Sequence, residues 1–316
     1  MSVHKREKRV PSPAAHLAPS ELWTADDSVL YHHTAPDSWA LLRRVSKGVA
    51  RAMSTVRMPR SVRVTQAYWD ALPGNNADKR AVLIEKIATV VVTGRVESIE
   101  LPNIGMAGMR YAMEPVLVAA ITPALVHLDL HGNGFGPLGL AVLAPTLSTC
   151  TALVHLNLSN VQMGHVVSLR LSALLPGDAL APMTQVLCGV TALRHLDLSC
   201  NFFGGSRGFA SMCEAMVRSC RELVHLDFSA NNLGDQDMAD LLAQLCTTAI
   251  VDVNLSGNQT GAHGVAALFD ALPRWPSLAR LDFRFNMVRR DDKARARTVW
   301  VQGVHGVERD ARALKV

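Results

Sequence analysis

Apolar residues recur along this chain in one eleven-residue block. Leucine or a close relative stands at the first, fourth and sixth positions, and the residues at the third and fifth positions are polar or charged. The blocks are LVHLDLHGNGF from Leu125, LVHLNLSNVQM from Leu153, LRHLDLSCNFF from Leu193, LVHLDFSANNL from Leu223, IVDVNLSGNQT from Ile250, LARLDFRFNMV from Leu278 and a weaker copy, VESIELPNIGM, from Val96. Alternation of this kind predicts seven short β-strands, each with its leucines facing the core and the intervening residues on the other face.

The segments between the blocks carry a different apolar period. GLAVLAPTL from Gly139, MADLLAQL from Met238 and GVAALFDAL from Gly264 place apolar residues three and four positions apart, which indicates helices with one buried face. Successive blocks start 29, 28, 40, 30, 27 and 28 residues apart. The chain is therefore predicted to repeat a strand-plus-helix unit.

These blocks resemble the consensus LxxLxLxxNxL of the leucine-rich-repeat family over about two thirds of the chain. The spacing near 28 residues is similar to that of the ribonuclease-inhibitor-like subclass. The resemblance implies an α/β solenoid, or horseshoe, with a parallel β-sheet on its concave side and α-helices on its convex side. It also implies a protein-interaction scaffold or adaptor rather than an enzyme, with no catalytic residue.

Asparagine stands at the ninth position of five blocks. The residues are Asn133, Asn201, Asn231, Asn258 and Asn286. We expect their amides to bind backbone groups where each strand turns away. Ile104 and Val161 replace asparagine in the first and third blocks, so we expect those two turns to be less regular.

The repeats divide the chain into four predicted regions. These are residues 1–63, a basic arm with one amphipathic helix; 64–95, a helical cap with a helix from about Ala77; 96–288, the repeats; and 289–316, a basic tail or cap. The third repeat is longer than the others, with an apolar insertion at about 165–176. This insertion is either a contact patch or a longer convex helix.

Charge is distributed unevenly over these regions. Residues 1–95 hold 15 Lys/Arg and 8 Asp/Glu, residues 96–288 hold 9 and 15, and residues 289–316 hold 8 and 4. We expect the basic arm to bind an anionic partner, either an acidic protein surface such as tubulin or an RNA. Its candidate anchoring residues are Arg43, Arg44, Lys47, Arg51, Arg57, Arg60 and Arg63. Alternatively, the amphipathic helix folds back on the acidic repeats of the same chain.

The concave face carries the candidate binding residues. They are His127, Asp129, His155, Asn157, His195, Asp197, His225, Asp227, Asp252, Arg280 and Asp282. Histidines beside carboxylates on strands about 4.8 Å apart could hold a metal or respond to pH. Since repeat duplication copies such residues without any selected chemistry, we expect a protein-binding surface with no metal.

Other motifs favour neither a cofactor nor a membrane. Gly134, Gly136 and Gly139 form a GxGxxG pattern, but no acidic residue lies between Asp129 and Asp178 to bind a ribose, so we expect no cofactor and no small-molecule substrate. The six cysteines show no CxxC pairing, and we expect them to pack in the core. No apolar run approaches the ~20 residues of a membrane span. The first residues do not resemble a secretory signal, so we expect a cytoplasmic location.

The resemblance leaves several functional classes open. Similar proteins include ribonuclease inhibitors, innate-immune sensors and regulatory subunits of ciliary or flagellar axonemes, and the basic arm favours a subunit of a large axonemal or cytoskeletal assembly. An RNA-associated, ribosomal role is the alternative. Ran GTPase-activating proteins are also similar stacks, and Arg110 follows the first strand, but the tail here is basic where that family is usually acidic.

Overall fold

The strands of the protein form one open parallel sheet. The computed structural model describes residues 61–64, 66–74, 78–79, 96–105, 114–163, 180–302, 310 and 313–316. Nine strands lie side by side in chain order, each pairing with the next. They are β1 (Ser61–Arg63), β2 (Ser98–Glu100), β3 (His127–Asp129), β4 (His155–Asn157), β5 (His195–Asp197), β6 (His225–Asp227), β7 (Asp252–Asn254), β8 (Arg280–Asp282) and β9 (Leu314–Lys315).

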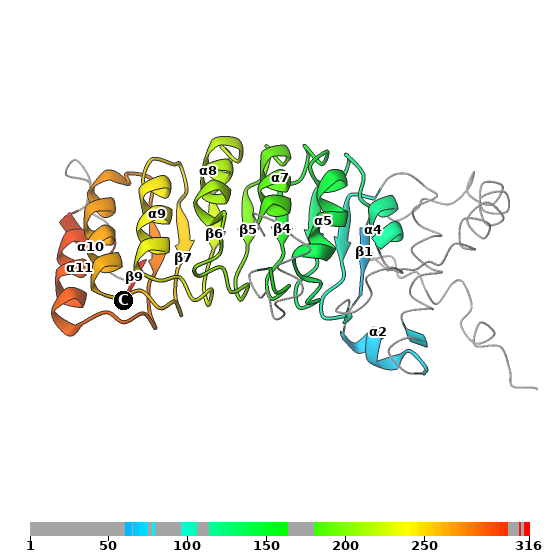
Figure 1. Cartoon of the computed structure of the whole chain (residues 1–316), viewed down its shortest axis with the longest axis horizontal. Coiled ribbons are helices and arrows are strands. Elements are labelled where there is room, and N and C mark those ends of the chain that lie inside the picture. The colour runs from blue at the N-terminus through cyan, green and yellow to red at the C-terminus, as the bar shows by residue number, and fades with distance from the viewer. Residues whose placement is uncertain are drawn as a thin grey trace, which may run out of the picture.

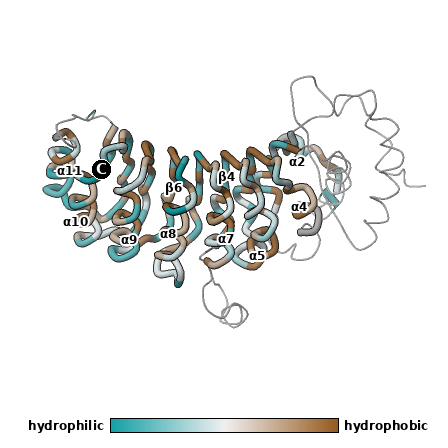
Figure 2. The backbone as a smooth tube through the Cα atoms, turned by 90° about the horizontal axis from the view of Figure 1, so that it is seen from above, coloured by the Kyte–Doolittle hydropathy of each residue, from teal (hydrophilic) through white to brown (hydrophobic). Residues whose placement is uncertain are grey.

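Helices connect the strands. They are α2 (Gln66–Ala71), α4 (Glu114–Ala120), α5 (Gly136–Leu147), α7 (Ala181–Gly189), α8 (Phe209–Ser219), α9 (Asp235–Leu245), α10 (Ala262–Ala271), the 3-10 helix η3 (Leu272–Arg274) and α11 (Arg290–Gln302). The helices from α4 to α11 lie along one side of the sheet, whereas α2 lies apart from them near its N-terminal end (Figure 1). Figure 2 shows the strands on the inner side of a shallow arc and the helices on its outer side. The predicted α/β solenoid, with a parallel concave sheet and convex helices, is confirmed.

The core follows from the alternation of residues in each strand. Leucines in register on neighbouring strands, such as Leu156 and Leu196, are both 2% exposed, whereas the residues on either side of them are half-buried. The helices supply the other side of the core through residues three and four apart, such as Leu241 and Leu245 of α9. Truncating such a leucine typically costs about 2–5 kcal/mol, so this continuous core holds the repeats together.

The predicted asparagine hydrogen bonds are present, and they connect neighbouring repeats. The Nδ2 of Asn201 donates to the carbonyl oxygens of Leu198 in its own repeat (3.1 Å) and Leu158 in the preceding repeat (2.7 Å). Its Oδ1 accepts the backbone N–H of Val161 at 3.1 Å. We call the set Asn133, Asn201, Asn231, Asn258 and Asn286 the asparagine ladder. Each member ties its own turn to the turn before it.

The turns that lack their own asparagine are not irregular, contrary to our expectation. The residue before the asparagine position has a left-handed backbone in every repeat, with φ between 51° and 72°. These residues are Asn103, Gly132, Asn160, Cys200, Ala230, Gly257 and Phe285. Asn133 and Asn201 of the following repeats accept the N–H groups of Ile104 and Val161. Asn231 makes the same bond to the N–H of Asn201, so this bond from the next repeat does not require an asparagine in the turn itself.

The sheet begins before the first recognised repeat. β1 pairs in register with β2, and Val62 and Val64 are each 1% exposed, so Arg63 belongs to the sheet rather than to a separate arm. The boundaries drawn at residues 63 and 96 therefore cut through the folded unit. SVRV keeps the alternation of a strand but lacks the leucines and the asparagine of the consensus. Residues 1–60, the insertion at 165–176 and most of the helix expected from Ala77 lie outside the described residues.

The last repeat is covered by the C-terminal residues. The side chain of Trp300 in α11 is fully buried, and its indole N–H donates to the carbonyl oxygen of Asp310 at 2.8 Å. β9 then pairs with β8 and continues the sheet by one strand. Residues 289–316 thus include a cap over the end of the core, as terminal repeats require.

The cysteines are free, and most of them pack in the core. Cys150, Cys213, Cys220 and Cys246 are buried, and burial raises the pKa of the Cys150 thiol to about 11. Cys188 is exposed and Cys200 is half-buried, so the expectation of a core position is wrong for these two. None of the described helices is both long enough and apolar enough to cross a bilayer.

Candidate interaction surface on the concave face

Two rows of polar side chains cross the concave face, one residue from each strand. The histidine row is formed by His127, His155, His195 and His225, which lie in register on β3 to β6. The carboxylate row is formed two residues later by Asp129, Asn157, Asp197, Asp227, Asn254 and Asp282. Both rows, except for Asp282 on β8, line a groove of about 360 Å³ that runs from β3 to β7. The structure thus brings together most of the concave residues predicted from the sequence.

The histidine row is a stack of imidazole rings. The ring centroids are 5.3 Å apart between His127 and His155, 4.1 Å between His155 and His195, and 4.4 Å between His195 and His225. The last two pairs are nearly parallel, with interplanar angles of 12° and 8°. The stack follows from the spacing of parallel strands, about 4.8 Å.

The stacked histidines resist protonation. Burial lowers the pKa of the His155 and His195 side chains below the ordinary histidine value, and the neighbouring imidazoles act in the same direction. The middle of the row is therefore uncharged at neutral pH. The sequence suggested that carboxylates beside the histidines could make the row respond to pH. Neighbouring carboxylates would do so by favouring protonated imidazoles, but the pKa values of these two side chains shift in the opposite direction.

At its β6 end, the histidine row meets a pair of oppositely charged residues, Asp252 on β7 and Arg280 on β8. The Nδ1 of His225 lies 3.2 Å from the Oδ2 of Asp252, the residue in register on β7. The same oxygen forms an ion pair with the guanidinium of Arg280 on β8 at 2.8 Å. Asp252 and Arg280 thus occupy the concave positions predicted for them, and they neutralise each other.

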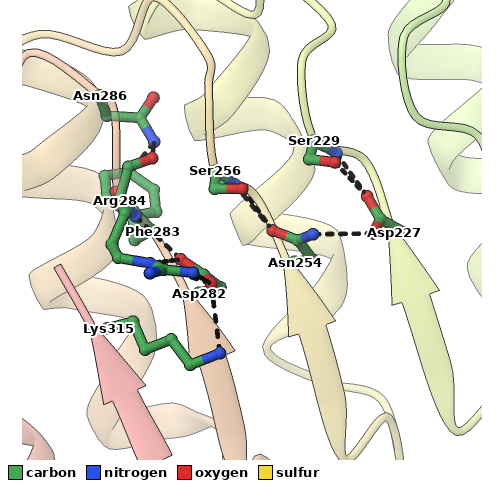
Figure 3. Close-up of polar contacts among 9 residues, drawn as sticks. All are labelled: Asp227, Ser229, Asn254, Ser256, Asp282, Phe283, Arg284, Asn286 and Lys315. Carbon is green, nitrogen blue, oxygen red and sulfur yellow. Dashed lines mark hydrogen bonds and ion pairs between the residues drawn. The ribbon is translucent and has the colours of Figure 1, made fainter.

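Each residue of the carboxylate row also stabilises the turn that follows its strand. Asp227 Oδ1 accepts the backbone N–H of Ser229 at 2.8 Å and its hydroxyl at 2.6 Å. Asn254 makes the same two bonds to Ser256, at 3.1 and 2.7 Å (Figure 3). Asp197 accepts the N–H of Ser199 at 2.9 Å. Sequence reasoning missed this role, although Asp or Asn followed two residues later by Ser is its signature.

The acidic residues on the outer strands of the sheet, Glu100 and Asp282, have cations beside them. Arg63 forms an ion pair with Glu100 at 2.8 Å, which extends the charged row onto β1 and β2. Asp282 pairs with Arg284 at 2.6 Å and with Lys315 at 3.5 Å (Figure 3). Asp129 Oδ1 lies within hydrogen-bond distance of the Nδ1 of His131, at 2.8 Å. The Asp282 end of the row is therefore compensated by cations within the protein.

The centre of the row differs from its Asp282 end. Asp197 and Asp227 lie in register on neighbouring strands, and neither forms an ion pair with another described residue. Burial raises the pKa of the Asp197 carboxyl, and the charges of Asp227 and Asp129 act in the same direction. An amide hydrogen bond from Asn254 to Asp227 Oδ2, at 2.7 Å, is the contact that the structure supplies to the second oxygen.

Two further expectations from the sequence concern a metal site and the basic residues of the arm. Within the described residues, no group of three or more His, Cys, Asp or Glu is arranged to hold a metal ion. Arg43, Arg44, Lys47, Arg51, Arg57 and Arg60 of the arm lie outside the described residues, as does Arg110. Of the predicted arm residues, the structure places Arg63, and it places it in the sheet.

The chain is similar over part of its length to two curated proteins. No family model matches it. It is 31% identical over 172 residues to the Tonsoku-like protein of Danio rerio, which covers 53% of this chain and 11% of that protein. It is 30% identical over 240 residues to the human protein NLRC5, which covers 66% of this chain and 12% of that protein. The chain thus spans about an eighth or less of the length of these relatives.

Solved structures give weaker similarities. The leiomodin-1 actin-binding site 2 matches with a TM-score of 0.28 and 17% identity over 31% of this chain and 61% of that chain. The TLR13–ssRNA13 complex matches with a TM-score of 0.33 and 13% identity over 72% of this chain and 33% of that chain. Neither score bears on the function of this protein. The repeated LxxLxLxxN block, the open parallel sheet with its helices and the asparagine ladder give the chain the fold of a leucine-rich-repeat solenoid.

Proposed function

We propose that this protein is a non-enzymatic interaction scaffold that binds a partner protein in its concave groove. The observation that carries the proposal is the alignment of the histidine and carboxylate rows along one open groove. Exposed columns of a solenoid vary without altering its core, so they are the positions at which repeat proteins acquire binding specificity. We also assign the repeats to the ribonuclease-inhibitor-like type, on their length and their α-helices.

The shape of the groove favours a protein over a small molecule. The groove runs across five strands, and its lining combines imidazole, carboxylate and amide groups with the side chains of Leu156, Leu196 and Leu226. Small-molecule sites are typically concave pockets that bury most of the surface of their ligand. An open groove with the same groups repeated from strand to strand suits a segment of polypeptide that lies across the strands.

Photo-cross-linking tests this surface directly. A photo-reactive amino acid placed at Asn157, which lies next to Asp197 in the carboxylate row, should give a protein adduct in native extract. The same amino acid at Arg218, which is exposed on the convex helix α8, serves as the matched control and should give no such adduct. Adducts of equal yield from both positions, or adducts from Arg218 alone, would contradict binding in the groove.

For the basic arm, we propose anchoring within a larger assembly, such as a ciliary axoneme or the microtubule cytoskeleton. Support comes from the charge of residues 1–95, with 15 Lys/Arg against 8 Asp/Glu. Removing residues 1–60, which leaves β1 intact, should abolish co-sedimentation with such an assembly while the circular dichroism spectrum of the repeats persists. Unchanged co-sedimentation contradicts the anchor. Loss of co-sedimentation on ribonuclease treatment would instead favour an RNA partner.

A further inference from the structure

The two central carboxylates of the groove form an uncompensated pair. Asp197 and Asp227 face each other across neighbouring strands, and like charges in this position destabilise a sheet. Glu100 and Asp282, on strands toward the ends of the sheet, have the cations Arg63, Arg284 and Lys315 beside them. Among the described residues, no ion pair offsets the charge of the central pair. The groove therefore concentrates negative charge at its middle.

The turn geometry does not require this charge. Asn157 and Asn254 stand at the same position on the flanking strands, and their amide oxygens accept the same hydrogen bonds from Ser159 and Ser256. An asparagine at position 197 or 227 would therefore serve the fold equally well. What the aspartates add at the centre is negative charge that faces the groove.

The carboxylate pair lies beside the stacked part of the histidine row. The imidazoles of His195 and His225 lie two residues earlier on the same strands, and the row that contains them is stacked. Burial lowers the pKa of His195, so that its ring carries no charge to offset the carboxylates. Partial burial strengthens electrostatic interactions in the groove, because fewer water molecules screen the charges.

We propose that the groove binds a basic segment of a partner protein, with one lysine or arginine side chain between Asp197 and Asp227. This proposal rests on the proposed function and specifies the chemistry of the partner. Charge complementarity is the reason for the choice. The strands that carry the two carboxylates are about 4.8 Å apart, a distance that a guanidinium group can bridge with two charge-assisted hydrogen bonds. Arginine is the residue best suited to such a bidentate contact.

The proposal has a consequence for pH. Acidification adds positive charge to the histidine row and removes negative charge from the aspartates, so it should weaken the binding of a cation. The titratable and charged groups that face this part of the groove are His127, His155, His195, His225, Asp129, Asp197, Asp227, Asp252, Arg194 and Arg280. Lowering the pH from about 7.5 to about 5.5 should therefore reduce affinity, in addition to any effect of salt.

A peptide titration with the full chain tests the proposal. The probe is a fluorescent peptide of about 12 residues with alternating arginine and alanine, and its partner peptide carries glutamate in place of arginine. The arginine peptide should bind, and the combined variant Asp197→Asn, Asp227→Asn should weaken its binding at least about tenfold. Asparagine keeps the turn bonds, so a loss of binding reports the charge rather than unfolding. Circular dichroism checks that the variant folds.

The matched control changes the same kind of charge on the convex side. Glu214→Gln in α8 removes one exposed carboxylate, paired with Arg218, and should leave binding of the arginine peptide unchanged. Binding that survives in the double aspartate variant, or that falls equally in Glu214→Gln, overturns the proposal. Binding that appears only after removal of residues 1–60 also overturns it, because the basic arm of the same chain would then be the occupant.

The two proposals fail in different ways. If the photo-reactive group at Asn157 still gives its adduct when Asp197 and Asp227 are both asparagine, the groove binds a partner but not through a cation. In that case this inference fails while the proposed function stands. If no adduct forms at Asn157 in the wild-type chain, the proposed function itself fails.

Discussion

Two polar rows run the length of the solenoid with the same repeat, four residues apart in each block, and they have different roles. In the asparagine ladder, members such as Asn201 and Asn231 are fully buried and bind backbone groups of two repeats. In the carboxylate row, Asp197 uses one oxygen for its turn and directs negative charge into the groove. Equal periodicity in the sequence therefore conceals a difference in hydrogen bonding. A row whose hydrogen-bonding groups are not all used by the fold can bind a partner.

The largest expected effect comes from breaking the ladder. Asn201→Leu would leave the carbonyl oxygen of Leu158 and the N–H of Val161 buried without partners. It would also remove one of the two amide hydrogen bonds to the carbonyl oxygen of Leu198. We expect the free energy of unfolding to fall by about 2–5 kcal/mol. Urea denaturation followed by circular dichroism measures this. Asn286→Leu, at the half-buried end of the ladder, is the matched control and should cost less, because water can reach its partners. Equal losses would contradict a role for burial.

A smaller effect should appear when the pH is lowered. Since the folded protein lowers the pKa of His155 and His195, the unfolded chain takes up protons first as the pH falls below about 6.5. The free energy of unfolding should therefore decrease between neutral pH and the lowered pKa values. Replacing both residues by serine, the residue found in register at Ser98, should flatten this dependence. Asp197, with its raised pKa, contributes in the opposite direction, because its destabilising charge is lost as the pH falls through the pKa of the folded state. A pH dependence that stays the same in the double serine variant would rule out the histidine row as its source.

The smallest effect distinguishes the two roles of a single residue. Asp197→Asn keeps the hydrogen bond to the Ser199 N–H and removes a charge next to Asp227, so we expect stability to rise by about 0.5 kcal/mol at neutral pH. Asp197→Ala removes the charge and the hydrogen bond together and should lower stability by about 1 kcal/mol relative to the asparagine variant. Thermal unfolding of the two variants provides the comparison. Identical stabilities would show that the turn bond contributes nothing.

The prediction from sequence succeeded where the apolar or polar character of the residues indicates which of them are buried. The seven expected strands appear where the third to fifth positions of each block stand, and the helices coincide with the three apolar segments that were recognised. It failed at both ends of the sheet. β1 is held by Val62 and Val64, and β9 consists of Leu314–Lys315, and neither segment carries the leucines and asparagine of the consensus. Their strand conformation is stabilised by pairing with β2 and β8, which local pattern cannot show.

By itself, the sequence determined which side chains enter the core and which face the groove. Alternation within a strand leaves no other choice once one face is buried. Only the tertiary structure decided which of the groove residues are neutralised. Arg63 reaches Glu100, and Lys315 reaches Asp282, from strands that the consensus does not include. The charge that remains at Asp197 and Asp227 depends on distances between repeats, because electrostatic energy follows spatial separation and burial rather than position in the chain.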